Sequence, residues 1–287
     1  MIATVSRVYP PLKWHGGKFY LAPKIVALMP PHLHYVEPYA GGLSVLLARD
    51  PADKRLWLGN GGSENGVSEV VNDLNEQLTN FWRVLQQPER FARFQRLCEA
   101  TPLSRIEFDR AANQGHDISD DPVLAAWQFF VRCRQSLAGR MKGFTSLTRN
   151  RTRRGMNGNV SEWLGAIEGL PAVHERLRLV VIENLDAIKL IRREDAQSTL
   201  FYLDPPYLHE TRATDDVYAH EMGPDHHAEL LEVICACKGR VMLSGYPSEL
   251  YDRRLHDWKR YEFVLPNQAA GGKTKRRMTE VVWCNFY

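Results

Sequence analysis

The stretch Thr199-Leu200-Phe201-Tyr202-Leu203-Asp204-Pro205-Pro206-Tyr207 decides how this chain is interpreted. Its first five residues are almost all apolar, which is typical of a strand that is buried on both faces of a parallel sheet. The two prolines cannot donate backbone hydrogen bonds, so we expect the strand to end before Asp204. A carboxylate, the carbonyl of Pro205 and the ring of Tyr207 would then meet at one edge of the sheet. This combination suits a planar amine with two N–H donors, although an isolated match is equally compatible with a plain turn.

Two glycine-containing segments lie near the N-terminus. The first is Leu12-Lys13-Trp14-His15-Gly16-Gly17-Lys18, and the second is Tyr35-Val36-Glu37-Pro38-Tyr39-Ala40-Gly41-Gly42. The second segment predicts a short strand, an acid and a glycine-rich turn that leads into a helix near Leu43. Glu37 would repel a phosphate, and the phosphate-loop pattern G-x-x-x-x-G-K-[ST] does not occur. The turn therefore favours an uncharged ribose or a cationic ligand.

Val70-Val71-Asn72-Asp73-Leu74-Asn75 predicts a second short strand that ends in an acid. In doubly wound nucleotide-binding folds, an acid at this position accepts hydrogen bonds from both ribose hydroxyls. Asp73 is therefore the candidate for binding a ribose. An aspartate here is also a common cap for a following helix, in this case the amphipathic stretch from Leu74 to Leu85, and the two roles are compatible.

Taken together, these segments resemble the D12 class, or Dam-like, adenine-specific DNA methyltransferases. The resemblance rests on K-W-x-G-G-K at 13–18, E-P-Y-A-G-G at 37–42, N-D-L-N at 72–75 and D-P-P-Y at 204–207, in that order. It extends to the closing Arg277-Met278-Thr279-Glu280-Val281-Val282-Trp283 and covers nearly the whole chain. It implies an α/β fold in which a Rossmann-like S-adenosylmethionine-dependent methyltransferase sheet carries an inserted, mainly helical target-recognition domain.

The resemblance implies site-specific methylation of DNA, with a methyl group passing from S-adenosylmethionine to N6 of a flipped-out adenine. Asp204 and the Pro205 carbonyl would accept the two N–H groups of the amine, Pro206 would keep the turn rigid, and Tyr207 would stack on the base. The remaining implied residues bind the cofactor together with Asp204: Trp14, Lys18, Glu37, Pro38, Tyr39, Ala40, Gly41, Asp73 and Asp186. A solvated surface position is the alternative for Lys18.

The chain has a formal net charge of only +3, yet its basic residues are concentrated. Residues 132–154 contain eight Arg and Lys residues and no Asp or Glu. Such a cluster favours a DNA-binding face, and a flexible solvated loop is the alternative. The predicted DNA-binding residues are Arg140, Lys142, Arg149, Arg151, Arg153, Arg154, Lys273 and Lys275.

The pattern along the chain predicts two domains. Residues 1–75 and 179–287 alternate strands with helices and would form the catalytic, cofactor-binding domain, whereas 76–178 would form the inserted recognition domain. We expect residues 59–66 to form a hairpin tip and residues 208–222 to form a lid.

No apolar stretch approaches the roughly 18 residues of a membrane span, and no signal peptide is apparent. Five scattered cysteines favour free thiols in the cytoplasm, we expect His226-His227 at the surface, and no metal site is predicted.

Two other classes of function remain open at this stage. One is methylation of another amine, on cytosine N4, RNA or a protein glutamine, although Asp204 follows the tendency of adenine enzymes. The other is a catalytically silent DNA-binding protein of the same fold. Double-stranded DNA is the expected partner, and a paired restriction endonuclease is a candidate second partner.

Overall fold

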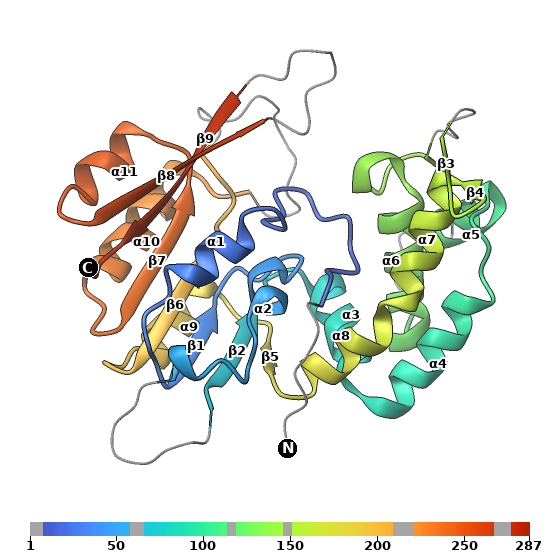
Figure 1. The fold of residues 1–287 in the computed structure, drawn as a ribbon, viewed down its shortest axis with the longest axis horizontal. Coiled ribbons are helices and arrows are strands. Elements are labelled where there is room, and N and C mark those ends of the chain that lie inside the picture. Colours follow the sequence, from blue (N-terminus) through green and yellow to red (C-terminus); the bar gives the residue numbers. More distant parts are fainter. Residues whose placement is uncertain (1–7, 58–65, 114–118, 146–150, 209–220, 267–276) are drawn as a thin grey trace. The chain divides into compact units, whose positions relative to one another are not determined.

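The structure is a computed structural model that describes residues 8–57, 66–113, 119–145, 151–208, 221–266 and 277–287 (Figure 1). The chain divides into two compact units. The first comprises residues 1–28, 41–53 and 75–184, and the second comprises residues 29–40, 54–74 and 185–287. Arg149, Lys273 and Lys275 lie outside the described residues, as do most of the hairpin expected at 59–66 and of the lid expected at 208–222.

The second unit contains a mostly parallel sheet, which agrees with the predicted α/β class. Its strands follow the order β2-β1-β6-β7-β9-β8. Strands β2, β1, β6 and β7 run parallel, whereas β9 is antiparallel to both β7 and β8. The bounds are β1 His34–Glu37, β2 Ser68–Asn72, β6 Thr199–Leu203, β7 Arg240–Gly245, β8 Lys259–Pro266 and β9 Arg277–Cys284, and a 3-10 turn η1 spans Lys54–Leu56.

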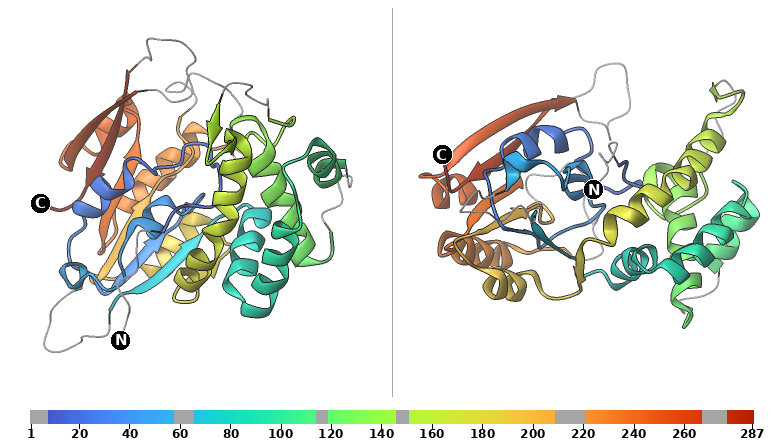
Figure 2. Two further views of the ribbon diagram at one scale, coloured as in Figure 1. Left: turned by 45° about the vertical axis from the view of Figure 1, so that its right-hand side comes forward. Right: turned by 60° about the horizontal axis from the view of Figure 1, so that its bottom comes forward.

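Three helices cover one face of this sheet: α9 Ala187–Glu194, α10 Pro224–Cys235 and α11 Glu249–Arg254 (Figure 2). Their apolar side chains pack against Phe201 and Leu203 of β6 and against the matching residues of the neighbouring strands. Because side chains alternate along a strand, the intervening residues point to the opposite face. Those residues include the polar side chains of Tyr35, Glu37, Tyr202 and Ser244, all of which are buried.

The first unit is mainly helical and has an aromatic core. Phe81, Phe94, Phe129, Phe130 and Trp163 are all at most 2% exposed, and their rings lie within 6 Å of one another in successive pairs. The elements are α1 Ala22–Ala27, α2 Ser44–Ala48, α3 Glu76–Gln86, α4 Pro88–Glu99, α5 Arg105–Asn113, α6 Pro122–Gln135, η2 Leu137–Gly139, β3 Thr152–Arg153, β4 Met156–Asn157, α7 Gly158–Glu168, α8 Leu170–Leu177 and β5 Val181–Glu183. The segment predicted as an insert, 76–178, lies within this unit.

One local prediction and two of the alternatives are wrong. Asn75, rather than Asp73, caps α3, since the Asn75 side chain accepts a hydrogen bond from Leu78 N. His227 is fully buried and not at the surface, and its ring Nδ1 lies 2.8 Å from the Tyr251 hydroxyl. His226 is exposed. Lys18 is 8% exposed, which excludes the solvated position that was its alternative.

Within the described residues, no helix is long and apolar enough to cross a membrane. In the same part of the chain, no group of three His, Cys, Asp or Glu side chains is arranged to hold a metal ion. All five cysteines are free thiols.

Candidate active site

Acidic residues follow three adjacent parallel strands at the same edge of the sheet. Glu37 is the last residue of β1, Asp73 follows β2 directly and Asp204 follows β6 directly. The register pairs Glu37 with Val71 of β2 and Val36 with Phe201 of β6. The three carboxylates therefore share the carboxyl end of the sheet, which is where ligands bind in open α/β folds.

Asn72 joins three backbone segments at this edge. Its side-chain amide donates to the carbonyl oxygens of Pro38 at 2.9 Å and Leu185 at 3.0 Å, while its Oδ1 accepts from Leu185 N at 2.8 Å. The Asn72 carbonyl also accepts from Ala40 N at 2.8 Å. The turn after β1 and the residue that precedes Asp186 are thus fixed next to Asp73.

The candidate cofactor residues in the second unit differ in burial. Glu37 is 2% exposed and its Oε1 accepts from the Tyr35 hydroxyl at 2.6 Å. Asp73 is half-buried, so part of this residue is open to solvent. Asp186 is exposed and caps α9, because its Oδ1 accepts from Lys189 N at 3.0 Å. Burial raises the pKa of Tyr39 far above its ordinary value, with Tyr251 and Asp186 adding to the effect.

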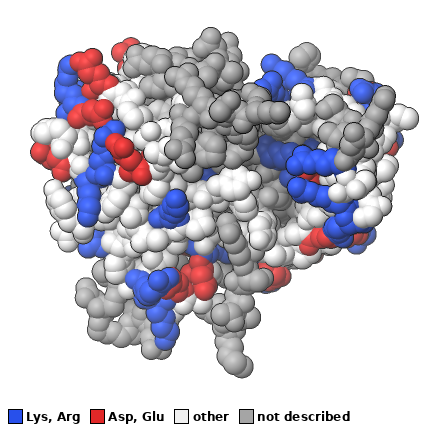
Figure 3. Space-filling model, turned by 45° about the horizontal axis from the view of Figure 1, so that its top comes forward, with Lys and Arg blue, Asp and Glu red and all other residues white. Residues whose placement is uncertain are grey.

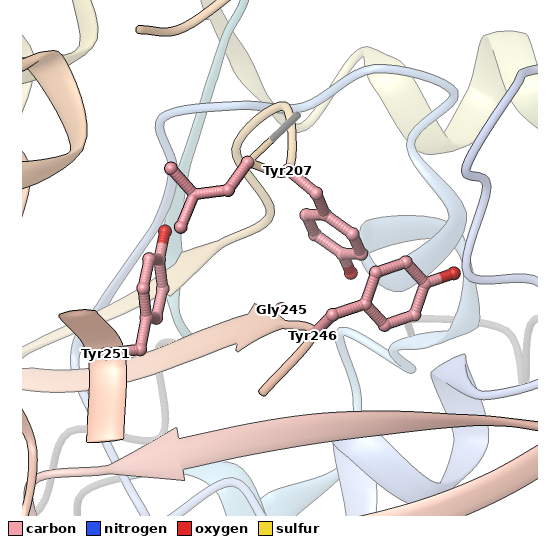
Figure 4. Close-up of a pocket in the computed structure, with 5 residues that line it drawn as sticks. Tyr207, Gly245, Tyr246 and Tyr251 are labelled. Atoms are coloured by element: carbon pink, nitrogen blue, oxygen red, sulfur yellow. The ribbon is translucent and has the colours of Figure 1, made fainter. Parts of the chain in front are cut away.

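The Asp-Pro-Pro-Tyr segment forms a compact turn after β6. Tyr207 is 7% exposed, and its hydroxyl lies 3.1 Å from Asp204 Oδ1 and also contacts Glu280 Oε1 of β9. Its ring packs edge-on against Tyr246, with centroids 4.7 Å apart. A small pocket adjoins this ring, and its lining is Tyr207, Leu208, Gly245, Tyr246 and Tyr251 (Figure 4).

Two buried phenols at this end of the sheet keep their protons. Burial raises the pKa of Tyr207 well above its usual range, and the nearby charges of Asp204 and Glu280 raise it further. Tyr202 behaves in the same way for the same leading reason, and its hydroxyl lies 2.9 Å from Ser244 Oγ. Both hydroxyls are therefore hydrogen-bond donors throughout the physiological range.

In the first unit, Trp14 lies against the glycine turn. A Cβ at Gly41 would lie 2.8 Å from Trp14 Nε1, and a Cβ at Gly42 would lie 2.8 Å from Trp14 Cβ, so any larger residue at either position would have to displace the Trp14 side chain. Gly41 also has a φ of +47° and accepts a hydrogen bond from Trp82 Nε1 at 3.2 Å. The Lys18 ammonium donates to the Gly16 carbonyl at 2.9 Å.

A short hairpin presents most of the described basic candidates. Strands β3 and β4 are joined by Arg154 and Gly155, which both have positive φ, as a two-residue type I′ turn requires. Lys and Arg side chains gather over the helical unit, on the right of Figure 3. The exposed members of this set are Arg140, Lys142, Arg151, Arg153 and Arg154, of which Arg154 forms a two-pronged ion pair with Glu168 at 2.8 and 2.9 Å.

Two arginines of the basic segment are instead part of the helical packing. Arg132 Nη2 donates to Gln77 Oε1 at 2.7 Å, and Arg134 Nη2 donates to the Glu162 carbonyl at 2.6 Å. Burial lowers the pKa of both guanidinium groups. The basic surface is therefore smaller than the sequence indicated.

The comparison with protein families decides the identity. The model of the D12 class N6 adenine-specific DNA methyltransferases matches residues 14–259. The chain belongs to this family. It is an adenine-specific DNA methyltransferase that transfers a methyl group from S-adenosylmethionine to adenine N6. The chain matches no curated protein sequence.

The residues of the second unit suit the cofactor of this D12 class enzyme. S-adenosylmethionine supplies a methyl group on a positively charged sulfur and carries a ribose with two hydroxyls. The carboxylate of the half-buried Asp73 can accept from both hydroxyls, and the negative charge of Glu37 favours a cation over a phosphate.

Three residues of this edge have no role in the motifs that predict the site: Tyr35, Asn72 and Glu280. Tyr35 lies two positions before Glu37, the spacing that puts two strand residues on one face, so alternation could have paired them. Asn72 lies directly before the candidate ribose acid, but its partner Leu185 is 113 residues away. The contact between Glu280 and Tyr207 depends on the pairing of β9 with β7, which no local pattern specifies.

Proposed function

We propose that Asp204, Pro205, Pro206 and Tyr207 form the site that binds the adenine amine of this D12 class enzyme. The two N–H groups of N6 donate to the Asp204 carboxylate and to the Pro205 carbonyl. The prolines hold these acceptors in fixed directions because their rings restrict the backbone. The observation that supports this proposal best is the shared strand edge, where Asp204 lies beside the acids that end β1 and β2.

The two acceptors act through the charge that develops on nitrogen. The lone pair of N6 is delocalised into the purine ring, so the amine is a weak nucleophile until the nitrogen becomes tetrahedral. S-adenosylmethionine would supply the methyl group: as the bond from N6 to the methyl carbon formed, the bond from that carbon to sulfur would break with its electron pair kept by sulfur. The Asp204 carboxylate would accept the proton that N6 then releases. Hydrogen bonds to Asp204 and Pro205 strengthen as N6 becomes positive, so they stabilise the transition state more than the ground state. Stacking of Tyr207 on the extruded base stays a prediction.

The cofactor residues that we propose in the second unit are Glu37, Pro38, Tyr39, Ala40, Asp73 and Asp186. Asp73 accepts from the ribose hydroxyls, and the turn from Pro38 to Ala40 borders the methionine part. The hydrogen bonds of Asn72 to Pro38 and Leu185 support this assignment, because they keep the turn and Asp186 next to Asp73. Cofactor contacts of Trp14, Lys18 and Gly41 in the first unit stay predictions.

We further propose that residues 76–178 recognise the DNA target and that the hairpin β3–β4 contacts the phosphate backbone of the DNA. Exposure of Arg151, Arg153 and Arg154 supports this role, since phosphate contacts need side chains that reach solvent. The enzyme would flip adenine out of the duplex before the transfer. Cytoplasmic location and protection against a paired restriction endonuclease remain predictions.

One experiment separates the two halves of the proposed site. We expect Asp204→Ala to lower the rate of label transfer from S-adenosylmethionine to DNA by about 100-fold or more even at saturating cofactor, which a lost cofactor contact of Asp204 alone would not do. We expect Asp73→Ala to do the reverse, with a large rise in the cofactor dissociation constant. Calorimetric titration with S-adenosylmethionine and single-turnover transfer measure the two effects. Near-normal transfer by Asp204→Ala would overturn the assignment.

The same assay addresses the rival substrates. Nucleoside analysis of the methylated DNA should give N6-methyladenine, in line with the family of the chain. N4-methylcytosine without N6-methyladenine would contradict this function, and binding of DNA without any transfer would indicate a silent enzyme.

A further inference from the structure

Glu280 is a buried carboxylate that the proposed transfer does not use. It lies in β9 and is 7% exposed. Its neighbours Val281 and Trp283 belong to the core under the helices, whereas the Glu280 side chain contacts the Tyr207 hydroxyl. A charged group is costly to bury, so its placement beside the amine-binding turn calls for a role.

Among the residues that the structure describes, two carboxylates can accept the one proton of the Tyr207 hydroxyl. The hydroxyl lies 3.1 Å from Asp204 Oδ1 and also contacts Glu280 Oε1. Burial raises the pKa of Tyr207, so the phenol keeps that proton, and it can give a full hydrogen bond to only one of the two carboxylates. The choice of acceptor is a rotation of the hydroxyl, because the ring is packed against Tyr246.

The two choices differ in their effect on Asp204. A hydrogen bond from Tyr207 to Asp204 disperses the negative charge of this carboxylate and makes it a weaker acceptor for N6. A hydrogen bond from Tyr207 to Glu280 leaves the full charge of Asp204 to meet the positive charge that develops on the amine.

We propose that Glu280 is a positioning residue that draws the Tyr207 hydroxyl proton away from Asp204. Glu280 contacts the Tyr207 hydroxyl, and its effect on the transfer is proposed to pass through that contact. The inference rests on the proposed role of Asp204 as acceptor for the adenine amine. It predicts that the loss of an acceptor at position 280 harms transfer only while the Tyr207 hydroxyl is present.

A double-mutant cycle tests this dependence. Glu280→Met keeps the length of the side chain without an oxygen acceptor, Glu280→Gln keeps an Oε1 acceptor, and Tyr207→Phe removes the hydroxyl. We expect E280M to slow single-turnover transfer by about tenfold at saturating DNA and S-adenosylmethionine, and E280Q to stay within about threefold of the parent enzyme. Adding E280M to Y207F should change the rate by less than about twofold, and the KM for DNA should hardly move.

Three results would overturn the inference. The first is an E280M rate equal to that of the parent enzyme, and the second is a loss that is the same with and without Y207F. The third is an E280M protein with a strongly lowered melting temperature, which would make Glu280 a structural residue. Asp204→Ala distinguishes failure of this inference from failure of the proposed function. An active D204A would contradict the proposed amine site itself. An inactive D204A together with a fully active E280M would contradict only the role of Glu280.

Discussion

Asn72 and Leu185 bind each other twice, across 113 positions of the sequence. Asn72 Nδ2 donates to the Leu185 carbonyl at 3.0 Å, and Leu185 N donates to Asn72 Oδ1 at 2.8 Å. An amide side chain is suited to this pairing because it carries a donor and an acceptor side by side. The pair fixes the spacing between Asp73 and Asp186, which follow Asn72 and Leu185 in the chain.

The first prediction concerns Asn72→Asp. The new carboxylate still accepts from Leu185 N but faces the carbonyl oxygens of Pro38 and Leu185, to which it cannot donate. We expect a loss of stability of about 1–3 kcal/mol, which is typical when a buried polar group is left unpaired, and a clear drop in cofactor affinity. Asn72→Ala is the matched control, since it removes the bonds without adding a charge, and it should be the milder variant. Thermal unfolding with and without S-adenosylmethionine measures both effects. Equal cofactor affinity in all three proteins would show that Asn72 does not order the site.

The second prediction concerns Gly41→Ala. Gly41 has a φ of +47°, and an added Cβ would lie 2.8 Å from Trp14 Nε1. A left-handed conformation alone costs a residue with a Cβ about 1–2 kcal/mol, so we expect a loss of stability of at least that size together with weaker cofactor binding. Gly165→Ala is the control, because Gly165 lies in α7 and a Cβ added there would have no neighbouring atom within 4 Å outside its own helix backbone and chain neighbours. That variant should instead gain about 0.5–1 kcal/mol, as alanine does over glycine in a helix. Denaturant unfolding compares the stabilities of the two variants. A G41A protein as stable as the parent enzyme would mean that Trp14 can move away from the turn at little cost.

The third prediction concerns pH and Asp121, the cap of α6. A hydrogen bond from Arg93 holds the pKa of this carboxyl below its usual value, and the backbone N–H of Val123, which donates to Oδ1 at 2.9 Å, acts in the same direction. A lowered folded-state pKa stabilises the fold above the unfolded pKa of about 3.9, and this stability is lost as the pH falls through the folded-state value. Asp121→Asn keeps the capping oxygen but not the charge. The stability difference between the parent enzyme and D121N should therefore be largest near neutral pH and shrink below about pH 4, as urea unfolding at several pH values would show. A difference that grows on acidification would contradict this account.

The sequence predicted those parts of the molecule in which local pattern decides the structure. The apolar runs before Glu37, Asp73 and Asp204 became parallel strands, because a buried strand needs only a continuous apolar run and a break. The three acids consequently share an edge. The contact between Glu280 and Tyr207 joins residues 73 positions apart, and the burial of His227 depends on packing against Tyr251. Such contacts follow from how the elements pack, which periodicity does not specify.

The cluster of basic residues in the sequence predicted an exposed binding surface. This is correct for the exposure of Arg151 and Arg153 but not for Arg132 and Arg134. The first two lie in and beside a short hairpin, and both residues are exposed. The other two lie in the packed helix α6. Their guanidinium groups donate hydrogen bonds to Gln77 and to the Glu162 carbonyl. A run of basic residues thus overstates a binding surface when part of it belongs to a packed helix.

The last prediction concerns the salt dependence of DNA binding. Each phosphate contact that a basic side chain makes contributes about 0.9 to the slope of log affinity against log salt, because it releases a condensed counterion. We expect replacement of Arg151 and Arg153 by alanine to weaken binding and to reduce this slope by about 1–2. Arg154 is already paired with Glu168, so its replacement should add less, and Glu168→Gln should strengthen binding at low salt by releasing Arg154 from this pair.

The control replaces Arg192 and Arg253, two exposed arginines of α9 and α11 that also pair with glutamates. Fluorescence anisotropy across a salt series measures the slopes. An equal reduction by the control pair would mean that the slope reports net charge, and an unchanged slope in the Arg151 and Arg153 variant would move the DNA interface away from the hairpin.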